Sequence, residues 1–102
     1  MAYVRVAGAD EVPVGQGVLV DVNGVTLALF NAGGGRFHAT SPFCPHEDGP
    51  LAEGWIEGDA VVCPWHGFDF ALATGRCRVD EGIAITVYPV RVSGSDLEVD
   101  VP

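Results

Sequence analysis

Two pairs of reactive side chains stand out because each combines a thiol with an imidazole at short spacing. Cys44 and His46 lie in the stretch FCPHEDGPL, and Cys63 and His66 lie in VVCPWHGFDF. The first pair has the spacing C-x-H, the second has C-x-x-H, and 16 residues separate His46 from Cys63. Thiolates and imidazoles are ligands of zinc and iron. Four of them in two short segments therefore indicate a metal site.

The order of the ligands distinguishes between metals. Structural zinc sites usually take two cysteines from one knuckle or two histidines from one helix. Here each segment supplies one cysteine and one histidine. That order fits a dinuclear iron cluster, in which each segment sends its cysteine to one iron and its histidine to the other. The alternative is a structural zinc site, which would make the chain an interaction module without redox function.

Composition and charge limit the possible partners. The 102 residues match the length of one domain, and a hydrophobic content of 48% is that of a globular chain. Fourteen acidic residues against five arginines and no lysine give a net charge of −9. We expect no binding to nucleic acid or to anionic membranes, because both require a basic surface. A basic protein surface is the better match.

The sequence also bears on the compartment. Its first residues lack the pattern of a signal peptide, and no run of 18 apolar residues occurs. The three cysteines are an odd number, which does not form a closed disulfide framework. We therefore expect a cytoplasmic protein whose thiols are reduced and available as ligands.

Short runs of apolar and β-branched residues are typical of strands. Such runs cover residues 4–6, 18–22, 25–30, 36–39, 83–92 and 97–101. The dipeptide Asn23-Gly24 predicts a tight hairpin, and the stretches 33–35 and 93–95 predict further turns. No dozen residues show apolar spacing of helical period. The sequence predicts an all-β fold, as stacked antiparallel sheets or a small sandwich.

The two cysteine and histidine pairs lie on loops between these strands, at about residues 41–50 and 61–70. The first loop contains three prolines and a glycine, which we expect to exclude regular structure. The second lies between the apolar runs 60–62 and 68–70. We predict a single domain over residues 1–102 in which the two loops form a metal-binding subdomain.

At this level the sequence resembles the Rieske 2Fe-2S proteins, whose signature is C-x-H followed about 16 residues later by C-x-x-H. The stretches DGPL, G-x-I-E-G-D, FDF and TGR also resemble those of Rieske-type ferredoxins, over nearly the whole chain. The resemblance implies one 2Fe-2S cluster per chain, with Cys44 and Cys63 on the inner iron and His46 and His66 on the outer iron. It implies an electron carrier between a flavin-dependent reductase and a terminal, aromatic-ring-hydroxylating oxygenase.

The loops differ from those of high-potential Rieske proteins. Those proteins have a disulfide between the loops where this chain has Gly49 and Trp65, and they have Ser and Tyr donors to the cluster sulfurs where it has Phe68 and Phe70. Loss of these donors disfavours the reduced, more negative cluster. We expect a midpoint potential of about −150 mV, at the low end of the Rieske range.

A second partner is left open by the segment after TGR. The stretch CRVDEGIAITVYPV is similar to the small subunit of NAD(P)H-dependent nitrite reductase, whose large subunit would then be the partner. We expect a monomer that is not itself an enzyme, because an oxygenase needs a second iron held by two histidines and a carboxylate, and only His38 remains. Cys77 is interpreted as a buried small residue. Trp65 is interpreted as a shield for the cluster, as part of a docking face, or as a side chain that simply packs within its loop.

Overall fold

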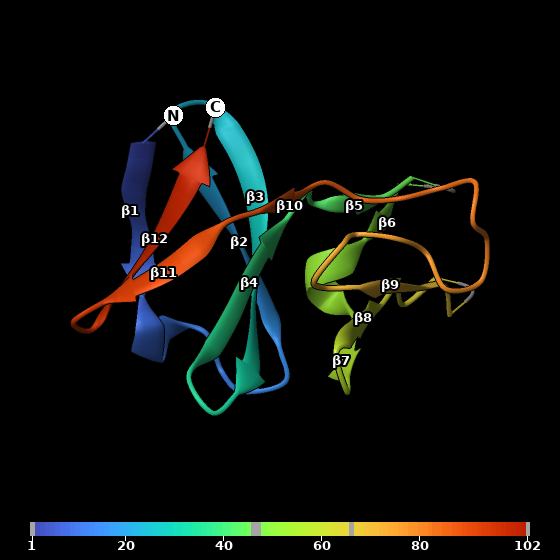
Figure 1. Ribbon diagram of the computed structural model, residues 1–102, viewed down its shortest axis with the longest axis horizontal. Coiled ribbons are helices and arrows are strands. Elements are labelled where there is room, and N and C mark those ends of the chain that lie inside the picture. Colours follow the sequence, from blue (N-terminus) through green and yellow to red (C-terminus); the bar gives the residue numbers. More distant parts are fainter. Residues whose placement is uncertain (1, 46–47, 66, 102) are drawn as a thin grey trace.

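A computed structural model of the protein describes residues 2–45, 48–65 and 67–101. Its strands form two lobes, and both chain ends lie in the first lobe while both predicted metal-binding loops lie in the second (Figure 1). The strands pair antiparallel in all four sheets. The predicted all-β fold class is therefore confirmed. No helix in the described part of the chain is long and apolar enough to cross a membrane.

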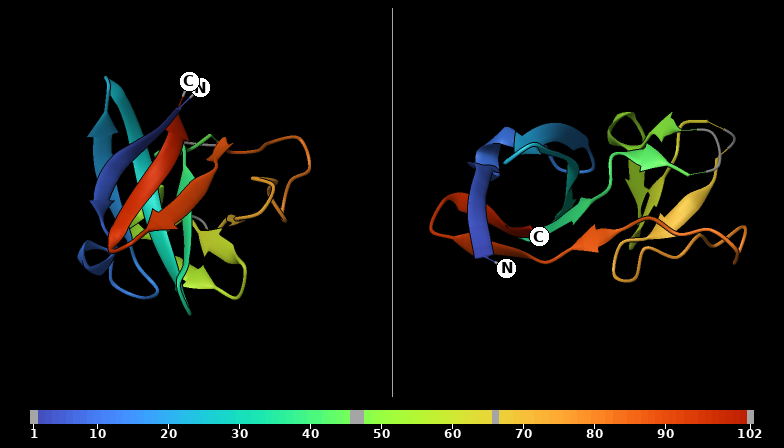
Figure 2. Two further views of the ribbon diagram at one scale, coloured as in Figure 1. Left: turned by 60° about the vertical axis from the view of Figure 1, so that its left-hand side comes forward. Right: turned by 90° about the horizontal axis from the view of Figure 1, so that it is seen from above.

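The first lobe is built from two sheets that face each other (Figure 2). One has the order β1 (Ala2–Gly8), β12 (Asp96–Val101) and β11 (Val90–Ser93). The other has the order β10 (Val87–Tyr88), β4 (Arg36–Thr40), β3 (Val25–Gly33) and β2 (Gly17–Val22). A short 3₁₀ helix, η1 (Ala9–Glu11), follows β1.

The core of this lobe follows from alternation along its strands. In β12 every second side chain is buried, as expected for a strand with one face toward a core. Leu97 and Val99 meet Leu27 and Leu29 of the opposite sheet in one hydrophobic cluster. The hairpin between β2 and β3 turns at Asn23 and Gly24, which have φ angles of 52° and 82°. Positive φ at both positions is the geometry that the Asn-Gly pair predicts.

The second lobe consists of two small sheets. One pairs β5 (Phe43–Cys44) with β6 (Gly49–Pro50), and the other has the order β7 (Trp55–Glu57), β8 (Ala60–Val62) and β9 (Asp69–Ala71). The 3₁₀ helix η2 (Leu51–Glu53) joins them. All three cysteines of the chain lie in the core of this lobe, beside Leu51 and Phe70.

Strand β3 connects the two cores, because it is buried on both faces. Leu27 and Leu29 point into the core of the first lobe, while Ala28 and Phe30 belong to the core of the second. The chain enters the second lobe at Ser41 and leaves it near Thr86, and the backbone N–H of Ser41 donates to the carbonyl of Thr86 over 2.9 Å. The core that contains the cysteines therefore includes side chains of a strand whose other face belongs to the core of the first lobe.

Two strand predictions are wrong in detail. The predicted single strand 83–92 begins only at Val87, since residues 83–86 lie outside the named strands. It is also divided at Pro89, so that β10 pairs with β4 and β11 pairs with β12. Proline has no N–H to continue a ladder, and the carbonyl of Pro89 accepts from Asp100 instead, over 3.0 Å. The first loop is not free of regular structure either, because β5 and β6 form a two-residue ladder in which Pro50 lies opposite Phe43.

His38 makes the stability of the fold depend on pH. It lies on β4 opposite Phe30 and is partly buried. Burial, with the positive charge of Arg36 as the smaller cause, lowers the pKa of His38 below its usual value of 6.5. Because the folded chain binds this proton more weakly than the unfolded chain, its contribution is complete above about pH 6.5 and is lost as the pH falls toward the lowered pKa.

We therefore expect the free energy of unfolding to fall between pH 7.5 and pH 5.5 by more in the native chain than in His38→Gln. The difference should stay below about 1 kcal/mol, since the ring is only partly buried and water screens its charge. Denaturant titrations at both pH values measure it. Equal losses in the two proteins would contradict the role given to His38.

Candidate metal centre

Cys44 occupies the end of a very short strand. It is the last residue of β5, and the ladder places it opposite Gly49 of β6. Its side chain is fully buried in the core of the second lobe. His46, the second predicted ligand of this loop, lies outside the described residues. Of the first predicted pair, the structure therefore describes only the cysteine, Cys44, which is buried.

Cys63 begins the loop after β8. Its backbone N–H donates to the carbonyl of Phe68 over 2.7 Å, which closes the loop between β8 and β9. The thiol is fully buried, and Sγ accepts a hydrogen bond from the backbone N–H of Trp65 over 3.4 Å. His66 also lies outside the described residues.

Gly49 is where the two loops meet. A methyl group placed on Gly49 would lie 2.5 Å from Sγ of Cys63, which is closer than carbon and sulfur can approach. Gly49 is also the ladder partner of Cys44. The backbone of the first loop therefore reaches the sulfur of the second only because residue 49 has no side chain. This brings Cys44 and Cys63 into one buried region, as the sequence predicts.

The donor set fits an iron-sulfur cluster. Two buried cysteines from separate loops converge across a glycine, and the sulfur of Cys63 accepts a backbone N–H bond. Within the described ranges no three Cys, His, Asp or Glu side chains gather as they would around a metal ion, and two of the four predicted ligands fall outside those ranges. The histidine half of the predicted site thus stays a prediction.

Aromatic residues surround the cysteines. Phe70 is fully buried in the core that contains both thiols, and Phe68 is half-buried against the same core. A phenyl side chain has no donor to offer a cluster sulfur, and this is the basis of the low potential expected from the sequence. That potential stays a prediction. On the surface near the ligands, Phe43 and Trp65 are each about half exposed, at 49% and 47%.

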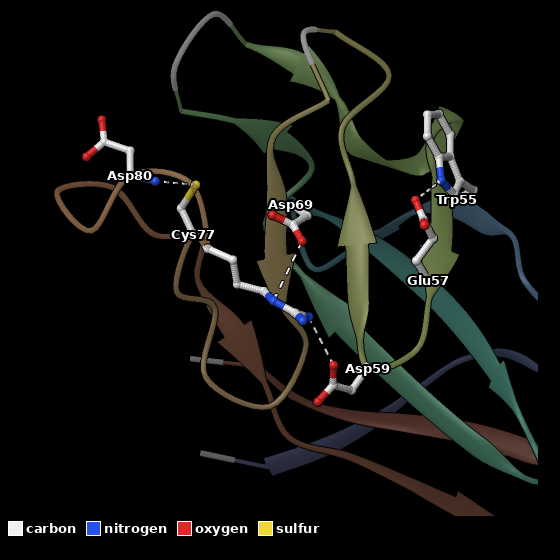
Figure 3. Close-up of polar contacts among 7 residues, drawn as sticks. Trp55, Glu57, Asp59, Asp69, Cys77 and Asp80 are labelled. Carbon is white, nitrogen blue, oxygen red and sulfur yellow. Dashed lines mark hydrogen bonds and ion pairs between the residues drawn. The ribbon is translucent and has the colours of Figure 1, made fainter.

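Cys77 behaves as the sequence predicts. It is buried in the same core, its backbone N–H donates to Ile83, and its Sγ accepts from the backbone N–H of Asp80 over 3.4 Å (Figure 3). Its thiol is free.

Arg78 forms two ion pairs that sequence reasoning missed. Its guanidinium contacts Asp59, at 3.1 Å, and Asp69, at 3.6 Å (Figure 3). Asp69 lies opposite Val62, the residue before Cys63. Arg78 therefore ties the segment after β9 to the hairpin that presents Cys63. No local motif signals this contact, since it depends on the register of β8 and β9.

The acidic residues between the ligands are not all free to attract a partner. Asp59 is paired with Arg78, and Glu57 accepts a hydrogen bond from the indole of Trp55 over 2.7 Å (Figure 3). Both carboxylates are nevertheless exposed, as is Glu53. The second lobe thus presents an acidic surface to solvent.

Comparison with known proteins agrees with this geometry. The model of the Rieske [2Fe-2S] domain matches residues 2–89. The 3-phenylpropionate/cinnamic acid dioxygenase ferredoxin subunit of Shigella boydii serotype 4 (strain Sb227) is 40% identical over 94 residues, which cover 90% of this chain and 87% of that protein.

Two solved structures share the fold. One is assigned as an NADH-dependent nitrite reductase small subunit from Mycobacterium tuberculosis, with a TM-score of 0.89, 28% identity, and coverage of 96% of this chain and 93% of that one. The other is from a complex of reduced oxygenase and oxidised ferredoxin in carbazole 1,9a-dioxygenase, with a TM-score of 0.81, 29% identity, and coverage of 95% and 91%.

The family match over residues 2–89, the 40% identity over most of the chain and the two buried cysteines agree with one another. The chain belongs to the Rieske [2Fe-2S] family, whose cofactor is a 2Fe-2S cluster.

Proposed function

We propose that this protein is a Rieske ferredoxin, which transfers single electrons between larger redox proteins. The observation that carries the proposal is the convergence of two buried cysteines, from two loops, around Gly49. A bound 2Fe-2S cluster supplies one-electron redox chemistry, and no nucleophile or substrate cavity is needed for that function. The relative named as a dioxygenase ferredoxin subunit, matched over 90% of this chain, supports the same reading.

The proposed ligands are Cys44, Cys63, His46 and His66. The two cysteines are buried in the core of the second lobe, so they would hold the inner iron, and the histidines would hold the outer iron. Two neutral imidazoles in place of two thiolates lower the negative charge of the site by two, which favours an added electron. The surrounding core, including Leu51 and Phe70, excludes water from the cysteine side.

The proposed partners are a flavin-dependent reductase as donor and a terminal oxygenase as acceptor. One structural neighbour is a ferredoxin in complex with the oxygenase of a dioxygenase system, which supports the acceptor. The net charge of −9 favours a partner with a basic docking surface. We further propose that the protein acts as a cytoplasmic monomer.

The large subunit of nitrite reductase is the second candidate partner. It is favoured by the similarity in fold to the Mycobacterium tuberculosis protein, with a TM-score of 0.89. It is also favoured by the segment after TGR, from Cys77 to Val90, which resembles nitrite reductase small subunits.

The ligand set predicts the metal content directly. The purified protein should be red-brown and contain two irons and two acid-labile sulfides per chain, with a Rieske-type electron paramagnetic resonance spectrum when reduced. Cys63→Ser should lose the cluster, because the buried thiolate is a ligand. Cys77→Ser is the matched control, since it alters a buried thiol in the same core and should retain iron and colour. A colourless protein with one zinc per chain would instead establish the zinc module.

The phenylalanines near the cysteines predict a low potential. With no side-chain donor at Phe68 or Phe70, the midpoint should lie near about −150 mV. A redox titration followed by visible spectroscopy measures it. A midpoint above about +100 mV would show that the sulfurs have other donors and that this interpretation of the two residues is wrong.

The partner is tested by affinity purification of the tagged protein from the cells that produce it. An oxygenase in the bound fraction, together with electron delivery from the reduced protein to that oxygenase at a rate that falls with added salt, is the expected result. Stable co-purification with a sirohaem-containing subunit would instead identify the protein as the small subunit of a nitrite reductase.

A further inference from the structure

Trp65 contacts the loop opposite to its own. A methyl group placed on Gly49 would lie 3.5 Å from both Cβ and the ring atom Cδ2 of Trp65, and 2.5 Å from Sγ of Cys63. The indole and the thiol therefore approach the same open side of Gly49. Because Gly49 is the ladder partner of Cys44, the ring of Trp65 lies against the strand pair that presents the other cysteine.

Trp65 also contacts Cys63 through its backbone, since its N–H donates to Sγ over 3.4 Å. The side chain is 47% exposed, so about half of a large ring is covered by the protein, while the thiol beside it is fully buried. Cys63 is only two residues away in sequence, at the end of β8, where the loop leaves the sheet. The partly covered indole and the fully buried thiol thus lie on the same side of Gly49.

We propose that Trp65 is a positioning residue that joins the two cluster-binding loops by packing on Gly49 and shields the Cys63 ligand from water. The inference rests on the proposed ligand set. The two residues at this junction, a glycine and a tryptophan, do not form a covalent link, so packing is what holds the loops together there. The effect depends on the size of the aromatic ring, and phenylalanine should preserve most of it.

The test uses the holoprotein in the presence of an iron chelator and a maleimide. The variants are Trp65→Ala and Trp65→Phe, with Trp55→Ala as the matched control, because Trp55 is 45% exposed and bonds to Glu57 of its own strand. Decay of the visible absorbance measures cluster release. We expect release to be on the order of tenfold faster in Trp65→Ala, and close to the native rate in the other two.

Labelling of individual cysteines separates local opening from unfolding. In Trp65→Ala the maleimide should modify Cys63 as the colour fades, while Cys77, which is 4% exposed in the same core, should stay protected. Mass spectrometry of the peptides measures both. Labelling of Cys77 in step with Cys63 would mean that the substitution merely unfolds the lobe, and the proposal would fall.

The potential gives a readout that a purely structural role would not move. Water admitted by Trp65→Ala should stabilise the more negative reduced cluster, so the midpoint potential should rise. Trp65→Phe and Trp55→Ala should keep the native potential. A raised potential together with faster release supports the proposal, whereas an unchanged potential and release rate, with only electron delivery to a partner impaired, would reduce Trp65 to a docking residue.

A second variant, Gly49→Ala, alters the contact between the two loops from the side of the first loop. It serves if Trp65→Ala is too unstable to purify. Its methyl group would lie 2.5 Å from Sγ of Cys63, which must move, and in ordinary contact with the indole at 3.5 Å, so faster cluster release is expected. Gly82→Ala is its control, because a methyl there meets only the flexible carboxylate of Asp80, at 3.2 Å. Native release from Gly49→Ala would overturn the proposal while leaving an iron-containing protein, and so the proposed function, intact. A native chain without iron would instead remove the proposed function itself.

Discussion

The second lobe depends on one close approach, that of the Gly49 backbone to the sulfur of Cys63. Any side chain at residue 49 would overlap the thiol of Cys63, and its Cβ would contact the indole of Trp65. The ladder between β5 and β6 then places Cys44 directly across from that point. Two cysteines that are 19 positions apart in the sequence thus share one buried region, and the rest of the lobe is arranged around them.

Strand β3 connects the core that contains the two cysteines to the core of the first lobe. Strand β3 contributes Leu27 and Leu29 to one core and Ala28 and Phe30 to the other, so the two lobes share a strand that neither can release independently. A one-residue slip in its register would exchange these side chains between the cores, which strongly disfavours alternative pairings. Arg78 pairs with Asp59, which precedes β8, and with Asp69, which lies opposite the last residue of β8, directly before Cys63. A site that exchanges electrons with little rearrangement benefits from ligands held on such supports.

The sequence predicts the features of this protein that depend on local pattern. The alternation in residues 97–101 and the Asn23-Gly24 turn are local signals, and the structure confirms both. The break at Pro89 was missed because the alternation of residues 83–92 continues through it, while the exchange of partner sheets is a tertiary event. The burial of Cys44 and Cys63 agrees with the predicted site, whereas His46 and His66 lie outside the described residues.

What sequence reasoning could not supply is contact across the loops. Gly58, Gly67 and Gly75 have the positive φ angles that turn glycines often adopt, 62°, 70° and 81°. Gly49 is not among the positive-φ glycines, and its small size matters because of a sulfur 14 residues further along the chain. Only the register of β5 with β6 and the course of the loop after β8 reveal that neighbour.

The contact between Gly49 and Trp65 can also be compared with a disulfide at the same place, because the two respond differently to a reducing environment. A disulfide closing a loop of this size, with 15 residues between Gly49 and Trp65, is worth about 3 kcal/mol in the chain-entropy model. Half-burial of an indole, at about 100 Å² and 25 cal/mol per Å², contributes about 2.5 kcal/mol, as an upper estimate. Both figures are a few kcal/mol, the second covering all of the buried surface of the indole and not its contact with Gly49 alone. The two kinds of link differ in that a disulfide persists only where the redox poise allows, whereas packing is indifferent to it. An electron carrier whose loops are joined by tryptophan and glycine keeps its ligand geometry in a reducing environment, where a bridging disulfide would open.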